Sequence, residues 1–173
     1  MKYLKIFLVT FFLFNISSYS FSADIYFIDM KKILNQSQAG KTAQEYLKKK
    51  LSEDKKKFDK EQSALKKQET DLIAKKKLIS PEEYKKNLNA LRQKNIKHQK
   101  DRQLAANAIF KKKEKARAEL NKALKPILEK YMSENNISAV IERKSIVVAK
   151  TEIDLTDKIL KLLDKELKSI NLK

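Results

Sequence analysis

The chain has 173 residues, with one glycine, two prolines and no cysteine. The absence of cysteine excludes a disulfide framework, a thiolate metal site and a thiol-linked lipid anchor, so stability has to come from packing or self-association. The 40 Lys and Arg residues against 22 Asp and Glu residues give a formal net charge of +18. Such a surface attracts acidic protein segments, membranes with acidic headgroups or nucleic acid, although a solvated lysine face that keeps an elongated helix soluble explains it equally well.

The N-terminus has the pattern of a secretory signal peptide. Lys2 and Lys5 precede an apolar run, Ile6–Ile16, and the small residues Ser20 and Ser22 follow at the spacing that a signal peptidase reads. The apolar run is short for a transmembrane span, so an uncleaved anchor is the weaker alternative. We expect cleavage after Ser22 and a mature protein exported from the cytoplasm.

The mature chain is predicted to begin with a strand and a short helix. Ile25–Ile28 is an apolar, β-rich run typical of a buried strand, and Lys31–Ala39 is predicted to form a short helical segment. Gly40 is expected to interrupt that segment. Thr42 and Glu45 then have the spacing of a capping box, which predicts the start of a long helix.

The first long helix is predicted from about Thr42 to Leu78. Its large apolar residues recur every seven positions, at Leu51, Phe58, Leu65 and Leu72, which indicates a seam that faces another helix in a left-handed supercoil. The companion positions Asp54, Glu61 and Gln68 are polar. The seam is therefore thin, and we expect a flexible arm.

A single reversal is predicted in the middle of the chain. Ser80 is a good N-cap, Pro81 suits the first helical position, and Glu83 completes a capping box. The second helix is expected from Tyr84 towards Tyr131, with Leu72 meeting Leu88 and Leu91 and with Phe58 near Arg102 or Ala105. Pro126 should kink this helix or start a new turn near Lys125.

The predicted hairpin carries most of the charge. Between Lys41 and Lys130 there are 28 basic and 13 acidic side chains, a net of +15. The second arm is the extreme, with twelve Lys or Arg between Tyr84 and Arg117 against two acidic residues.

After a stop at Asn135-Asn136 the pattern changes to strands. Ile137–Ile141 and Ile146–Ala149 are β-rich runs, and Asp154 is expected to cap an amphipathic helix that ends near Leu167. The predicted fold is α+β and mainly α: a small body from 23–40 and 132–173, and an antiparallel hairpin arm, 41–131, with its tip near 79–82. So small a body buries too little surface alone, and sheets shared between copies would solve this.

The sequence offers little chemistry for catalysis. The single histidine, His98, lies on the predicted seam, where packing is a far more common role than ligation or catalysis. No Cys/His cluster has metal-ligand spacing, and one glycine cannot build a phosphate loop. We expect no enzyme activity, no cofactor and no metal.

Three stretches resemble the Skp (OmpH-like) family of periplasmic chaperones: 23–30 (ADIYFIDM), 68–75 (QETDLIAK), and 137–141 (ISAVI) through 154–157 (DLTD). The order of elements agrees over essentially all of the mature chain, although the lysine excess and Pro126 depart from the family pattern. The resemblance implies a periplasmic homotrimer in which strands from three subunits form a small barrel. Three hairpins hang from it around a cavity that holds unfolded outer-membrane β-barrel proteins, without nucleotide or metal.

Two sets of residues follow as candidates. The trimerisation body is expected to use Ile25, Phe27, Val140, Ile141, Val147 and Val148. Client contact is not carried by a motif, so the candidates are large apolar side chains of the arm: Phe58, Leu65, Ile96, Leu104 and Phe110. For Phe58 and Leu65 we favour packing within the hairpin.

The predicted function is an ATP-independent holdase, and two alternatives stay open. One is a basic envelope protein that binds an anionic membrane surface or nucleic acid. Lysine dominates arginine, and export separates the chain from cytosolic nucleic acid, so we expect no specific nucleic-acid partner. The other alternative is a structural coiled-coil adaptor with a fixed folded partner.

Overall fold

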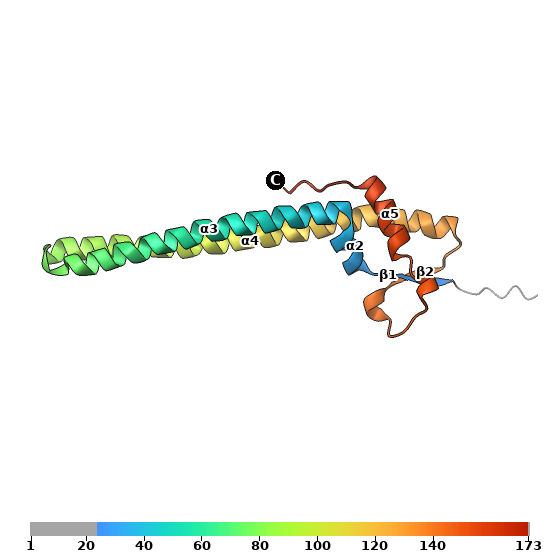
Figure 1. Cartoon of the computed structure of the whole chain (residues 1–173), viewed down its shortest axis with the longest axis horizontal. Helices are drawn as coiled ribbons and strands as arrows, with labels where there is room; N and C mark the ends of the chain where they lie inside the picture. Colours follow the sequence, from blue (N-terminus) through green and yellow to red (C-terminus); the bar gives the residue numbers. More distant parts are fainter. Residues whose placement is uncertain (1–23, 173) are drawn as a thin grey trace, which may run out of the picture.

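The computed structural model describes residues 24–172, so the predicted signal peptide lies outside the described residues. Figure 1 shows a long helical hairpin that projects from a small body at one end. The predicted α+β, mainly helical fold is confirmed. In chain order the elements are β1 (Ile25–Ile28), α2 (Met30–Gln36), α3 (Gln38–Ala74), η1 (Lys75–Lys77), α4 (Pro81–Glu134), β2 (Ala139–Glu142), η2 (Arg143–Ser145), η3 (Thr151–Ile153) and α5 (Thr156–Glu166).

The sheet has two parallel strands. The strand predicted at Ile25–Ile28 is confirmed as β1, and it pairs with β2 so that Ile25 lies opposite Ala139 and Ile28 opposite Glu142. Parallel strands need a crossover connection, and here the hairpin of α3 and α4 is part of that crossover. Both roots of the arm are therefore tied to the same small sheet.

The predicted third strand, Ile146–Ala149, is wrong. The chain leaves β2 through η2, without the positive φ angles of a tight hairpin turn. The other side of β1 is occupied, because the Leu155 N–H donates to the Phe27 carbonyl at 2.9 Å. In the described chain residues 146–149 have no strand partner, and Val147 and Val148 are 100% and 88% exposed.

The predicted helix start and capping box at Thr42 are also wrong. α3 begins earlier, with Ser37 as N-cap, and the Ser37 side chain accepts a hydrogen bond from the Gly40 N–H at 3.1 Å. The Thr42 hydroxyl instead donates to the Gln38 carbonyl at 2.8 Å. A Cβ atom on Gly40 would lie 2.0 Å from the carbonyl oxygen of Leu34. Glycine is therefore required because α2 folds back tightly on the start of α3.

The reversal is confirmed at Ser80. Its side chain accepts from the Glu83 N–H at 3.2 Å, and Pro81 stands at the start of α4. α4 has 54 residues, or ~80 Å at ~1.5 Å per residue. It continues through Pro126 to its end, so no new turn starts near Lys125.

The main core lies where α5 packs against α2 and the root of α4. Ile33, Ile159 and Leu163 are fully buried, and Leu120 and Leu124 of α4 join the same cluster. Leu120 and Leu124 thus belong to the core of the body, although they lie within 41–131, the range predicted for the arm. The predicted boundary between body and arm stays a prediction.

A partly buried polar contact lies at the start of α5. Asp154 Oδ1 accepts from the Thr156 N–H at 2.8 Å, whereas the N-cap itself is Leu155, one residue after the predicted Asp154, and has no side-chain cap hydrogen bond. The Thr156 hydroxyl also donates to Asp154 and accepts from the Asp29 N–H at 2.9 Å. Because Asp29 caps α2, this contact couples the end of β1 to the starts of two helices.

Candidate functional site

The arm is held together by few apolar contacts. Phe58, Leu65 and Leu72 of α3 are all buried, as the seven-residue repeat predicts. Leu72 and Leu91 belong to one cluster, against which Leu88 packs, so the expected contact near the tip is confirmed. Large apolar residues thus meet in the half of the arm nearest the tip.

Towards the root the seam opens. Leu51 continues the seven-residue repeat but is 56% exposed. It lines a hollow of about 350 Å³ together with Phe58 and with Ala105, Ala106 and Ile109 of α4. The small alanine side chains leave this space because they cannot reach across to α3. The thin seam predicted from the sequence is therefore present as an under-packed stretch.

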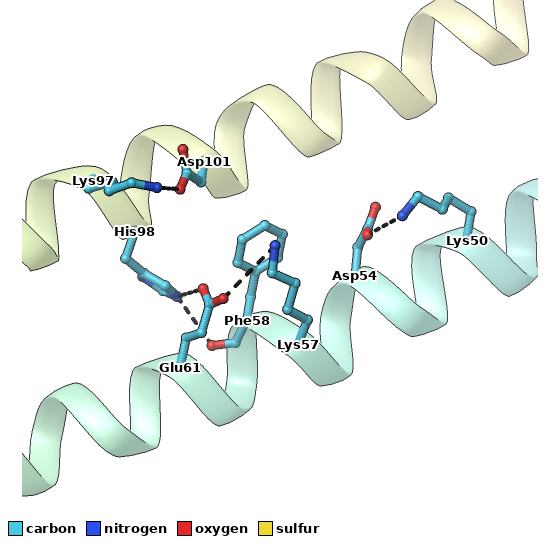
Figure 2. Close-up of polar contacts among 8 residues, drawn as sticks. All are labelled: Lys50, Asp54, Lys57, Phe58, Glu61, Lys97, His98 and Asp101. Atoms are coloured by element: carbon cyan, nitrogen blue, oxygen red, sulfur yellow. Dashed lines mark hydrogen bonds and ion pairs between the residues drawn. The ribbon is translucent and has the colours of Figure 1, made fainter. Parts of the chain in front are cut away.

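The middle of the arm is polar and centres on His98. Its side chain is buried, and Nε2 lies 3.2 Å from the Phe58 carbonyl oxygen and 4.0 Å from Glu61 Oε2 (Figure 2). The His98 and Phe58 rings meet edge to face, with centroids 5.7 Å apart. This is the packing role predicted for His98, because the ring fills the seam and its Nε2 finds a hydrogen-bond partner in the Phe58 carbonyl oxygen.

The charged groups of the arm pair mainly within each helix. Lys50 and Asp54 are 2.7 Å apart, and Lys97 bonds Asp101 one turn away (Figure 2). The hydrogen bond and the charge of Asp54 raise the pKa of Lys50, and the hydrogen bond from Lys97 lowers the pKa of Asp101. Such pairs support single helices and contribute little to holding the two helices together.

Exposed apolar side chains are scattered between these charges. Of the five client-contact candidates, Ile96, Leu104 and Phe110 are 58%, 54% and 63% exposed, whereas Phe58 and Leu65 are buried. At ~100° per residue the three exposed ones fall within an arc of about 120° on α4. The arm therefore offers a dotted apolar stripe rather than a continuous apolar face.

Sequence reasoning missed three further exposed apolar residues of the arm. Leu51 was assigned to the seam, and Ile73 and Leu78 near the tip were not singled out, although they are 60% and 80% exposed. Ile73 directly follows a buried seam residue, so its position in the repeat could have identified it as outward-facing.

The body end of the molecule also exposes apolar surface. Ile25, Ile141, Val147 and Val148 are all exposed, whereas Phe27 is buried and Val140 half-buried. The Arg143 guanidinium lies 5.6 Å from the centre of the Phe27 ring and covers it from outside. Within the described chain β2 pairs only with β1, which leaves its outer edge open.

In residues 24–172 no group of three or more His, Asp or Glu side chains could hold a metal ion. Among the same residues no helix is long and apolar enough to cross a membrane.

The chain is similar to known proteins in sequence and in fold. A family model described as outer membrane protein (OmpH-like) matches residues 24–163. No curated protein matches the chain. A crystal structure of an OmpH-like candidate outer membrane chaperone from Caulobacter crescentus CB15 is similar to this chain, with a TM-score of 0.78. The two chains share 20% sequence identity, and the match covers 85% of this chain and 87% of that one. At this identity the likeness establishes a common fold.

Proposed function

Because the chain belongs to the OmpH-like family, we propose that it is an ATP-independent periplasmic holdase chaperone. It binds unfolded outer-membrane β-barrel proteins between helical arms, keeps them from aggregating and delivers them to the outer membrane. In this proposal residues 1–22 are a cleaved signal peptide that directs export.

The observation that carries the proposal is the dotted apolar stripe of the arm. Ile96, Leu104 and Phe110 are exposed on a long helix, among exposed charged and polar side chains. Each contact with a client's apolar side chain stabilises the complex only slightly, at roughly 25 cal/mol per Å² buried, so affinity comes from many contacts. A client held in this way stays mobile. Release then needs no ATP, because folding into the membrane is more favourable than staying bound.

The charge of the arm supports fast capture. The net of +15 between Lys41 and Lys130 attracts acidic segments of a client and raises the rate of encounter. The thin seam supports adaptability, since a loosely packed pair of helices bends more easily to follow clients of different size.

Self-association is the second part of the proposal. Ile25, Ile141, Val147 and Val148 are exposed apolar side chains of the body, and the outer edge of β2 is open in the described residues. Unpaired edges and exposed apolar surface favour association, and three copies would share one barrel with Phe27 and Val140 beneath its surface. A homotrimer of this kind sets three arms around a common cavity.

The test is light scattering of the mature protein, from Ala23, with and without an outer-membrane β-barrel protein diluted from urea. We expect a trimer mass for the free protein and suppressed aggregation at about one trimer per client. The triple variant Ile96→Ser, Leu104→Ser, Phe110→Ser should suppress aggregation less well. The matched control, Gln93→Ser, Gln103→Ser, Asn107→Ser, alters exposed polar positions of the same helix and should behave like the wild type.

Other outcomes would point to the alternatives. Unchanged client aggregation, with binding to anionic vesicles that falls steeply as salt rises, would favour a basic protein that binds the membrane surface. Capture of one folded partner, with no effect on unfolded chains, would favour a structural adaptor.

A further inference from the structure

The C-terminal strap, residues 167–172, leaves α5 and runs back along the root of the arm (Figure 1). Its end packs on a small cluster of side chains from the two helices of the arm. We call this cluster the root seat; it consists of Ala43, Tyr46, Leu47, Lys112 and Ala116. Leu172 fills the seat and is only 4% exposed.

The strap binds like a β-strand. Ile170 and Leu172 both pack on the root seat, whereas Asn171 between them and Ser169 before them are exposed. Alternate side chains on one face are the signature of an extended chain, although the strap has no strand neighbour in the described residues. The root seat therefore accepts an extended segment with apolar side chains at every second position.

The polar contacts of the root seat recognise backbone rather than side chain. Lys112 Nζ donates to the main-chain carbonyl oxygen of Leu172, and the same nitrogen lies 3.1 Å from the Tyr46 hydroxyl and 5.2 Å from the centre of the Tyr46 ring. Any extended peptide offers such a carbonyl. The shape of the root seat and the alternation of apolar side chains therefore determine which peptides bind, and no particular sequence is required.

The strap is fully buried at one residue only. Leu172 is buried, and Leu167 and Ile170 are half-buried and also pack against the main core, while the backbone of the whole segment has to be ordered. The burial of these apolar side chains offsets only part of that loss of conformational entropy. The strap should therefore leave the root seat readily when another segment competes for it.

We propose that the root seat binds one strand-like segment of an unfolded client, and that the C-terminal strap occupies it in the free protein. The inference rests on the proposed holdase function, since β-barrel clients are rich in segments with alternating apolar residues. The strap shields the seat until a client arrives. A client that offers several such segments displaces it by mass action.

The experiment measures binding of two labelled short peptides to the mature protein by fluorescence anisotropy. One peptide has apolar residues at alternate positions, and the other has the same composition with its apolar residues in one block. The variant Ile170→Ser, Leu172→Ser frees the seat without changing chain length or charge. If the strap is closed in nine molecules of ten, this variant binds the alternating peptide about tenfold more tightly than the wild type.

The controls isolate the strap. Ser169→Ala, on the exposed side of the same segment, should leave the affinity unchanged, and the block peptide should gain nothing from the strap variant. Adding Lys112→Met to the strap variant should weaken binding of the alternating peptide. Equal affinity of wild type and strap variant for the alternating peptide would overturn the proposal.

A measurement on the unaltered protein covers the case in which a variant folds poorly. The Leu172 methyl signals in NMR should move to free-chain positions as the alternating peptide saturates the protein, and unmoved signals at saturation would overturn the proposal. Failure here is distinct from failure of the holdase function. A wild-type protein that still suppresses client aggregation, with its strap in place, would retain the function and lose only the root seat.

Discussion

Replacing Gly40 by alanine tests how the arm is joined to the body. Gly40 lies in the first turn of α3, where Ser37 caps the helix. An added Cβ would come within 2.0 Å of the Leu34 carbonyl oxygen and 2.8 Å of the Ser37 hydroxyl oxygen. The first contact is with backbone, so relief requires α2 to move away from α3.

The expected change in the free energy of unfolding is the sum of one stabilising and two destabilising effects. Alanine improves helix propensity by up to about 1 kcal/mol relative to glycine. Forcing a methyl group into a filled space costs about 1–3 kcal/mol, and disturbing the Ser37 cap costs about 1 kcal/mol more. The clash and the lost cap outweigh the propensity gain, so we expect Gly40→Ala to lower the free energy of unfolding by about 1–3 kcal/mol.

The assay is urea unfolding followed by circular dichroism at one fixed protein concentration, because self-association adds to apparent stability. Asn107→Ala, at an exposed position within α4, is the control and should be neutral or slightly stabilising. A Gly40→Ala protein as stable as the wild type, with an unchanged urea slope, would refute the close packing of α2 on α3.

Three further predictions concern the core, the tip and the charge pairs. Ile159→Ala should lower the free energy of unfolding by about 2–5 kcal/mol, measured by urea unfolding, because its side chain is fully buried in the body; a smaller loss would mean that the site collapses around the gap. Ser80→Ala should cost about 1 kcal/mol and speed hydrogen exchange of the Glu83 amide, which loses its cap, while exchange in the body stays unchanged. The pKa of Asp101 is depressed below its ordinary value of 3.8, so the pair with Lys97 contributes stability above that pH and loses it as the pH falls through the depressed value. Lys97→Ala should return the Asp101 pKa towards 3.8 in an NMR titration, and an unchanged titration curve would contradict the assignment.

Local signals in the sequence were reliable where the structure depends on neighbours in the chain. The cap at Ser80, the apolar strand at Ile25–Ile28 and the buried repeat of Phe58, Leu65 and Leu72 are all confirmed. A cap is satisfied within one turn, and a repeat records which face of a helix is buried. The resemblance to the OmpH-like family is confirmed as well, because the family model matches residues 24–163.

Local signals failed where a distant segment decided the outcome. The run Ile146–Ala149 has β propensity, but a strand needs a hydrogen-bonding neighbour, and one side of β1 is occupied by the segment before α5. The client-contact candidates Phe58 and Leu65 could not be separated from Ile96 by residue type. Only the facing helix determines which of these side chains is covered.

The sequence by itself determined a glycine-poor helical hairpin with its reversal capped at Ser80, its high positive charge, the absence of cysteine and a single histidine on the seam. It did so because capping, periodicity and charge are properties of residues close together in the chain. Only the tertiary structure decided that β1 and β2 pair in parallel, that Gly40 serves close packing rather than a break, and that Leu172 folds back onto the arm. Each of these joins residues far apart in sequence or elements that must touch in space, and no local pattern records such contacts.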